Sequence, residues 1–451
     1  MIPKLDAASR SLLLTLALGV FAGALDLSVL SPALPAIGKA FGIQTGALAW
    51  IFTLYLLANV ASIAIAATLA DRYGRRPLYL ICIAVFAVGS LLAIGAPNYS
   101  IFLIARAIQA LGAGGIFPVA TAAIGDTVAA EKRGAALGAV AATWGAAAVL
   151  GPTIGGIVTH YLSWRWIFAA NLPLAIWVFM RARRDVPKNA PRQRPPLDTL
   201  GLALLVVGLL LTVAGITLLH LALAIFGILV LTAFVLLERR VTHPLVPLSL
   251  FTTPQLARTY ALELCIGALE GSLFFVPAVI VAAQHRNEVE AGAIAALGAL
   301  AFVVVIPLSG RALDRAGSRT VLLLGSCCTA LGLAIFAVGF ASLLWSIVAM
   351  LVAGVGFGAL LGAPTRYIIT NATDEGRRST ALGFLSQALI VGQLLGGALI
   401  GGILNAGSIA SLGFRDAYLA FFAIALLALA VTTRLDSFAR ERSLRSLNDA
   451  A

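Results

Sequence analysis

Residues 69–74 of the chain read LADRYG, and residues 312–317 repeat this pattern as ALDRAG. Both segments follow a long apolar stretch and are too polar to lie in a membrane core. Three further matches keep the same order and nearly the same spacing: ALDLS at 24–28 with ALEGS at 268–272, Pro118 with Pro364, and ALG at 136–138 with ALG at 381–383. Together they indicate an internal duplication in which each copy takes about half of the chain.

The composition places both copies in a membrane. Of 451 residues, 61% are hydrophobic and 11% are charged, and the mean hydropathy is +1.01. Soluble domains are about 45–50% apolar and about 25% charged. A water-exposed surface could not cover this much apolar material, so we exclude soluble enzymes, nucleic-acid binders and disordered chains. The sequence predicts an all-α integral membrane protein.

Apolar stretches of about 20 residues, the length that crosses a bilayer, predict fourteen transmembrane helices. The least regular pair flanks His220, where almost no loop separates two helices. The predicted helices are 11–35, 47–69, 77–97, 100–124, 135–159, 166–182, 199–218, 220–238, 257–283, 291–310, 319–340, 342–366, 379–404 and 416–434.

The basic residues test this assignment through the positive-inside rule. Nearly all of the 31 Lys and Arg residues fall at alternate ends and connections, which are therefore predicted to be cytoplasmic. The opposite connections hold Lys39, Arg165, Arg286 and Arg415, and Arg106 lies within a predicted helix. This alternation predicts a multi-pass protein of the cell membrane, which is the inner membrane in a bacterium. Both termini are predicted to be cytoplasmic. The alternation also explains the net charge of +12 without a nucleic-acid partner.

An even number of helices in each copy predicts two parallel six-helix bundles. We assign residues 1–182 to the first bundle and 255–435 to the second, with a cytoplasmic tail at 436–451. Residues 183–254 have no repeat partner and carry two extra central helices. Parallel bundles that meet at a midplane cavity are typical of transporters with alternating access. Channels more often repeat as subunits around a pore.

Five motifs stand out along the chain: residues 67–76, ATLADRYGRR; 106–112, RAIQALG; 151–156, GPTIGG; 25–30, LDLSVL, followed by Pro32, Leu34 and Pro35; and 164–168, WRWIF, followed by Asn171 and Pro173. They resemble motifs of the major facilitator superfamily, and within it those of the fourteen-helix drug:proton antiporters. The resemblance covers the whole chain and is closer in the first half, although Ala67 stands where the loop motif usually has Gly.

The resemblance implies a proton-coupled secondary transporter that exports lipophilic, cationic drugs or toxic compounds by alternating access, and not an enzyme. A monomer in contact with membrane lipid is expected, with a small molecule and protons as its partners. Two alternatives remain open: an exporter or flippase of lipids or amphipathic metabolites, and a transporter-like receptor without transport.

Three carboxylates lie within predicted helices: Asp26, Glu263 and Glu270. A charge at the bilayer centre costs at least about 2.5–3.5 kcal/mol, so these acids are expected to face a cavity or a partner. Asp26 and Glu270 are repeat partners, which predicts opposite walls of one cavity. Glu263 and Glu270 share a helix face, two turns apart. We therefore hypothesise that the proton and a cationic substrate compete for the acidic cavity. In the alternative interpretation, some of these acids are permanently paired with Arg106 or with helix backbone.

Arg106 is the only basic residue in the middle of a predicted helix, and it cannot lose its charge. It therefore needs an acid or backbone carbonyls, and Asp26 is the candidate partner. The resemblance implies that Arg106 transmits protonation, with Gln109 one turn away. A fixed clamp between helices would also explain it.

The loop motif supplies a candidate conformational latch formed by Asp71, Arg72, Gly74 and Arg75, with Asp126 as an acceptor for one of the arginines. The resemblance implies that this network holds the two halves in the outward-open state. An exposed ion pair contributes only about 0–1 kcal/mol, so one such bond biases the equilibrium without locking it. Positive charge that merely fixes topology is the alternative.

The antiporter motif consists of Gly151, Pro152, Gly155 and Gly156. Small residues allow another backbone to approach, and the proline removes one helical hydrogen bond, so the motif predicts a bend and a tight helix seam. Ordinary membrane packing would give the same composition. The scattered histidines lack metal-ligand spacing, and no phosphate-binding loop is present, so we expect neither a metal nor a cofactor.

Overall fold

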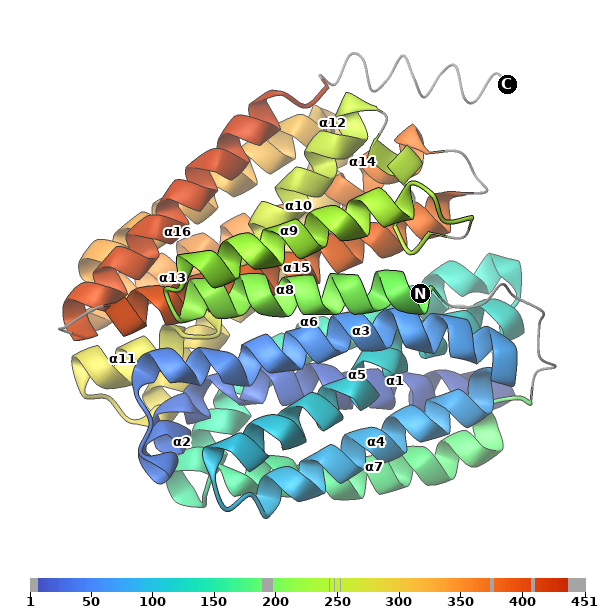
Figure 1. Ribbon diagram of the computed structural model, residues 1–451, viewed down its shortest axis with the longest axis horizontal. Coiled ribbons are helices and arrows are strands. Elements are labelled where there is room, and N and C mark those ends of the chain that lie inside the picture. The colour runs from blue at the N-terminus through green and yellow to red at the C-terminus, as the bar shows by residue number, and fades with distance from the viewer. Residues whose placement is uncertain are drawn as a thin grey trace.

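The computed structural model describes residues 7–188, 198–242, 244–246, 248–251, 253–373, 377–406 and 410–436. Within these ranges the regular secondary structure is entirely helical (Figure 1). The predicted tail, except for Asp436, lies outside the described residues, as does part of the linker before the central helices.

The helices form two bundles and one hairpin. The first bundle contains α1 (Ala7–Val29), η1 (Ser31–Ala33), α2 (Leu34–Phe41), η2 (Thr45–Leu48), α3 (Ala49–Tyr73), α4 (Arg75–Ile94), α5 (Tyr99–Thr127), α6 (Ala130–Tyr161) and α7 (Arg165–Asp185). The hairpin contains α8 (Thr199–Thr217) and α9 (Leu221–Glu238), and η3 (Leu248–Phe251) follows it. The second bundle contains α10 (Pro254–Leu273), α11 (Val276–Gln284), α12 (Glu288–Gly339), α13 (Leu343–Leu360), α14 (Pro364–Ala372), α15 (Arg378–Ala406) and α16 (Ala410–Thr433).

Polar side chains cap several helices where apolar stretches begin. Asn98 accepts a hydrogen bond from the backbone N–H of Ile101 at 2.9 Å, and Asp198 accepts one from Gly201 at 2.8 Å. Such caps satisfy backbone donors that the first turn of a helix leaves free. The apolar runs that follow have no alternative partner for their backbone in lipid, so they continue as helices.

Twelve described segments are long and apolar enough to cross a membrane. The expectation of fourteen crossings is therefore not confirmed by this count. The predicted helices 291–310 and 319–340 both fall within α12, which is 52 residues long. It contains one break at Gly317, where φ is 80° and ψ is 165°. Glycine tolerates a positive φ because it has no Cβ.

The predicted helix 166–182 corresponds to α7, which is not among the twelve candidate crossings.

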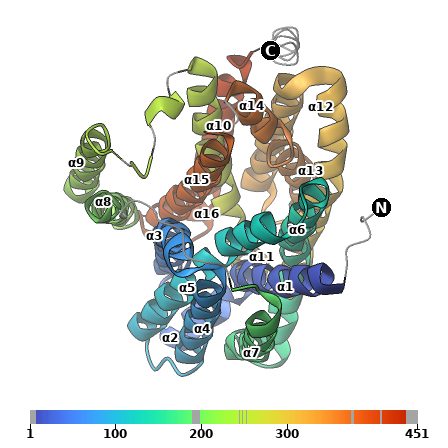
Figure 2. The ribbon, with the colours of Figure 1, turned by 90° about the vertical axis from the view of Figure 1, so that its right-hand side faces the viewer.

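The two bundles lie side by side, with α8 and α9 along one edge (Figures 1 and 2). The bundles meet along two seams on opposite sides of the molecule. In one seam α3 contacts α15, and in the other α6 contacts α12. α8 packs on both α3 and α15, whereas α6 and α12 lie on the far side from the hairpin (Figure 2).

Tight contacts between the bundles gather near α2 and α11, which we name the closed end. Here the ring of Phe52 stacks on Phe274 with 4.8 Å between centroids, and the Ser31 hydroxyl donates to the Phe274 carbonyl at 2.5 Å. Gly156 of α6 faces the carbonyl of Glu288 so closely that a Cβ would clash with it. The two halves are therefore held backbone to backbone at this end.

The opposite end, which carries residues 69–76 and 312–317, is named the open end. A Cβ placed on Gly134 or Gly138 of α6 would meet no heavy atom within 4 Å, and the same holds for Gly310 of α12 and Gly383 of α15. The ribbons of the two bundles also diverge in this direction (Figure 1). The close contacts between the bundles therefore gather at one end of the described arrangement.

Candidate functional site

Asp26 lies in a sealed polar cluster inside the first bundle. Its Oδ2 accepts a hydrogen bond from Nη1 of Arg106 at 2.6 Å, and its Oδ1 accepts from Gln109 at 2.7 Å and from Asn171 at 2.8 Å. The side chains of Asp26 and Arg106 are both 0% exposed. The predicted partnership of these two residues is thus present in the structure, and neither one faces open space.

Helix packing places this cluster at the centre of the first bundle. Gly89 of α4 lies against the backbone of Gln109, and Gly112 of α5 lies against the backbone of Phe86. A larger side chain at either glycine would separate α4 from α5. The guanidinium of Arg106 also stacks over the ring of Tyr55, 4.2 Å from its centroid. Cation–π contact and close packing together hold the arginine in place.

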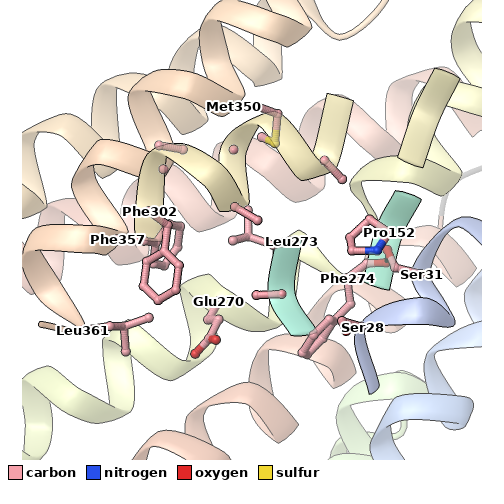
Figure 3. Close-up of a pocket in the computed structure, with 16 residues that line it drawn as sticks. Ser28, Ser31, Pro152, Glu270, Leu273, Phe274, Phe302, Met350, Phe357 and Leu361 are labelled. Carbon is pink, nitrogen blue, oxygen red and sulfur yellow. Dashed lines mark hydrogen bonds between the residues drawn. The ribbon is translucent and has the colours of Figure 1, made fainter. Parts of the chain in front are cut away.

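A separate cavity of about 130 Å³ lies between the bundles (Figure 3). Glu270 is its only charged lining residue, and most of the remaining wall is apolar or aromatic. The other lining residues are Ser28, Ser31, Ala148, Pro152, Leu273, Phe274, Ala295, Gly298, Ala299, Phe302, Met350, Ala353, Gly354, Phe357 and Leu361. The wall combines one acid, two hydroxyls, a thioether and three phenyl rings, which suits an apolar or aromatic cation.

Glu270 reaches the cavity from α10 and is held by α15. Gln393 donates a hydrogen bond from Nε2 to Oε2 of Glu270 at 2.9 Å. Gly267 and Gly271 of α10 both approach the backbone of α15 closely enough to exclude a Cβ. Among the residues that the structure describes, no Lys, Arg or His lies within 4 Å of the Glu270 carboxylate. Its charge therefore has a hydrogen-bond donor but no cation.

The predicted shared cavity differs from the observed one. Asp26, Arg106, Gln109 and Glu263 are absent from the lining of the cavity, and only Glu270 of the predicted set faces it. The physical reason is the permanent charge of Arg106, which attracts Asp26 into its own cluster. Duplication of the backbone does not duplicate this pairing, because α13 has no arginine. The offset that relates Pro118 to Pro364 places Val352 at the position equivalent to Arg106.

Glu263 is buried on α10, two turns from Glu270, with only 5% of its surface exposed. Within the described ranges, its Oε2 has no partner at hydrogen-bonding geometry. The sequence left open whether this acid is solvated near the membrane surface, and the structure places it inside the second bundle. The charges of Arg366 on α14 and Glu270 on α10 act on its carboxylate, and Thr365 of α14 lies beside it.

Sequence reasoning missed Gln393 and Ser90, and it treated Asn171 only as part of a motif. Gln393 is one of three amides in α15, with Gln387 and Asn405, and Ser90 is a hydroxyl within the apolar stretch of α4. Polar residues in the middle of membrane helices usually have partners, which was the available signal. Ser90 accepts a hydrogen bond from Gln109 at 2.8 Å and so extends the Asp26 cluster.

The candidate latch residues lie at the open end. Nε of Arg75 contacts Oδ2 of Asp126 at 3.2 Å, which joins α4 to α5 within the first bundle. Gly74 turns the chain between α3 and α4 with φ of 94°. Arg72 is exposed, and the side chain of Asp71 lies outside the described residues. The sequence predicted that Asp126 accepts one of the loop arginines without selecting which, and the structure shows Arg75. A bond between the bundles remains a proposal.

The antiporter motif forms the tight seam that its glycines predicted. Gly151 lies against Ser28 and Gly155 against the carbonyl of Val29, so α6 presses on α1. Gly156 faces α12 on the other side, and Pro152 lines the cavity. The motif therefore connects three features: the first bundle, the closed end and the cavity wall.

The sequence profile of the Major Facilitator Superfamily matches residues 16–256 and 259–448. An uncharacterized MFS-type transporter of Bacillus subtilis, YfiU, is 34% identical over 408 residues, which cover 86% of this chain and 79% of that protein. A multidrug resistance protein B homolog of Mycobacterium tuberculosis is 30% identical over 70% of this chain and 61% of its own length. The efflux pump dotC of Dothistroma septosporum is 34% identical over 53% of this chain, but the match spans only 44% of the pump.

Solved transporter structures share the fold at low sequence identity. The peptide-family transporter PepTSo superposes with a TM-score of 0.72 at 17% identity, covering 98% of this chain and 99% of that one. A D-xylose–proton symporter gives a TM-score of 0.71 at 14% identity, covering 95% and 98%. At these identities the likeness concerns the fold alone.

Proposed function

We propose that this chain, which belongs to the major facilitator superfamily, exports lipophilic cations in exchange for protons. It is a multi-pass membrane transporter, and its relatives include efflux pumps and a multidrug resistance homologue. The cationic substrate and the proton coupling rest on the chemistry of the cavity. The observation that carries them is Glu270, a lone acid in an apolar and aromatic wall between the bundles.

The cavity can hold either a proton or a cation at Glu270. A bare carboxylate in an apolar site is costly because no cation offsets its charge. Protonation removes this cost, and so does a bound organic cation whose apolar groups contact the surrounding phenyl rings. Proton and cargo therefore exclude each other at one carboxylate, which is the minimal requirement for exchange.

Alternating access follows from the two ends of the molecule. The described arrangement is closed near α2 and α11, and open near residues 69–76. The positive-inside pattern assigns the open end to the cytoplasm, so the arrangement corresponds to an inward-facing state with cytoplasmic termini. We propose fourteen crossings: the twelve candidates, α7, and a second crossing in α12 beyond Gly317.

In this scheme the Asp26 cluster has a different part from Glu270. Both oxygens of Asp26 are occupied, and Arg106 joins α5 to α1 through it. Protonation of Asp26 would release Arg106, and rearrangement of α1 would move Ser28 and Ser31 in the cavity wall. The cluster thereby links protonation in the first bundle to the shape of the shared cavity.

The test uses purified protein in vesicles, with tetraphenylphosphonium as the cation and an imposed pH gradient. Glu270→Gln is expected to lower proton-driven transport at least about tenfold, equivalent to 1.4 kcal/mol. Glu290→Gln is the matched control, because Glu290 is a partly exposed acid at the closed end. Unchanged coupling in Glu270→Gln would refute the proposal. Transport of a lipid instead of the cation would favour a flippase.

A further inference from the structure

The two seams between the bundles are covered differently. On one side, α8 fills the groove between α3 and α15 and builds a small apolar core there (Figure 2). That core contains Leu56, Leu57 and Val60 of α3, Leu209 and Val213 of α8, and Leu394 and Ala398 of α15. Lipid in this region therefore meets the hairpin before it can reach the seam.

The hairpin is attached to the second bundle. Asn405 of α15 donates a hydrogen bond to the carbonyl of Thr217 at 2.9 Å, and Gly402 lies directly against the carbonyl of Ile216. In the part of the chain that the structure describes, only apolar packing joins α8 to α3. Because apolar packing has no fixed direction, α3 can slide under α8 while the hairpin stays on α15.

The opposite seam, between α6 and α12, has no helix over it among the described residues (Figure 2). Large apolar side chains along it are exposed, including Leu150 of α6 and Leu300 and Val304 of α12, at 46%, 49% and 54%. In a membrane protein, such side chains contact lipid.

The cavity borders this uncovered seam. Six of its lining residues come from the two helices that form the seam: Ala148, Pro152, Ala295, Gly298, Ala299 and Phe302. None comes from α3, α8, α9 or α15. Except for Phe302 they are small, so this wall between the cavity and the lipid is thin.

We propose that lipophilic cargo reaches the cavity from the bilayer between α6 and α12, and that the α8–α9 hairpin closes the equivalent route between α3 and α15. This inference rests on the proposed function, because it supplies the cargo. It also gives the central helices, which the duplication does not explain, a physical role as a seal.

Lipid contact at the two seams can be measured without any transport. Spin labels are placed at Leu395, a partly buried neighbour of the α8 core, and at Leu300, in a background with Cys82, Cys265, Cys327 and Cys328 replaced. We expect oxygen dissolved in lipid to relax the label at position 300 strongly and the label at 395 weakly. Gly402→Val, which displaces α8, should raise the signal at 395. Gly383→Val, on the same helix but in open space, should not.

The route itself is tested at Gly145, which faces Val303 of α12 and does not line the cavity. Gly145→Leu should slow the association of tetraphenylphosphonium about tenfold with its equilibrium affinity unchanged, because only the approach is obstructed. Gly138→Leu, on the same helix with nothing nearby, is the control. If Gly145→Leu fails to fold, Val303→Trp obstructs the same space from α12.

Two results would overturn the inference. Equal lipid contact at positions 395 and 300 would show that the hairpin is no seal, and unchanged association in Gly145→Leu would show that cargo arrives through water at the open end. Absence of cation binding in the unaltered protein would refute the proposed function, and the route with it. The spin labels would still decide whether the hairpin covers its seam.

Discussion

Asp26 and Glu270 occupy equivalent positions in the two copies of the duplicated chain, but their surroundings are opposite. Asp26 has an arginine and two amides as donors and is fully buried. Glu270 has one amide donor and faces the cavity. An acid with a permanent cation stabilises the bundle that contains it, whereas an acid without one is available to an external cation. In our proposal the two acids therefore have different tasks: Asp26 holds Arg106 within the first bundle, whereas Glu270 binds the proton or the cation.

The largest expected effect is the loss of the paired charge. Asp26→Asn leaves the buried guanidinium of Arg106 without a counter-charge, and we expect the free energy of unfolding to fall by about 3–5 kcal/mol. Thermal unfolding in detergent measures it. The double variant Asp26→Asn with Arg106→Gln should recover much of the loss, because no unpaired charge remains. A single variant as stable as the unaltered protein would break the comparison.

The first half of this comparison could be predicted from sequence. Arg106 cannot lose its charge, so it needed an acid or backbone carbonyls as partners, and Asp26 was the candidate acid. The contact of Arg75 with Asp126 and the tight packing of Gly151, Gly155 and Gly156 followed in the same way from local residue types. These features depend on chemistry that each motif carries with it.

The cavity could not be predicted to the same extent. Repeat symmetry placed Asp26 and Glu270 on opposite walls, but pairing with Arg106 removed Asp26 from the cavity. The sequence also could not predict which seam the hairpin covers, because the apolar composition of its helices suits either one. The hairpin lies on α15 because Gly402 and Asn405 of that helix contact the end of α8. Only the folded chain brings these residues together.

A smaller effect is expected at Gln393, the one hydrogen-bond donor to Glu270 among the described residues. Gln393→Leu removes the hydrogen bond to the carboxylate, and we expect the affinity for tetraphenylphosphonium to fall about 5- to 30-fold, which corresponds to the roughly 1–2 kcal/mol of such a bond. Equilibrium binding to purified protein measures it. Gln393→Glu would place a second acid beside Glu270 and serves as a contrasting variant. An unchanged affinity in Gln393→Leu would show that Glu270 needs no positioning partner.

Asp185, the last residue of α7, is another acid that pairs with an arginine, Arg181. It lies beyond the end of the predicted crossing 166–182. Burial alone raises its pKa, but hydrogen bonds from Thr15 and Ser11 and the charge of Arg181 outweigh burial and lower it. A carboxyl whose pKa is lower in the folded protein stabilises the fold at any pH above its pKa in the unfolded chain. This stabilisation is lost as the pH falls through the lower pKa of the folded state. Asp185→Asn should thus cost about 1 kcal/mol at neutral pH and nothing in strong acid. Urea unfolding from pH 7 down to about pH 2, well below the ordinary Asp pKa of about 3.9, measures it.

The smallest effect on stability is expected at Glu270 itself. Glu270→Gln exchanges an acid for an amide of nearly the same shape, and no buried cation loses a partner, so the free energy of unfolding should change by less than about 0.5 kcal/mol. The same thermal measurement as for Asp26→Asn applies. Equivalent substitutions at the two repeat partners would then differ by several kcal/mol in their effect on the free energy of unfolding. A large loss at Glu270 would instead mean that its charge has an undetected partner, and the division between a structural acid and a binding acid would fail.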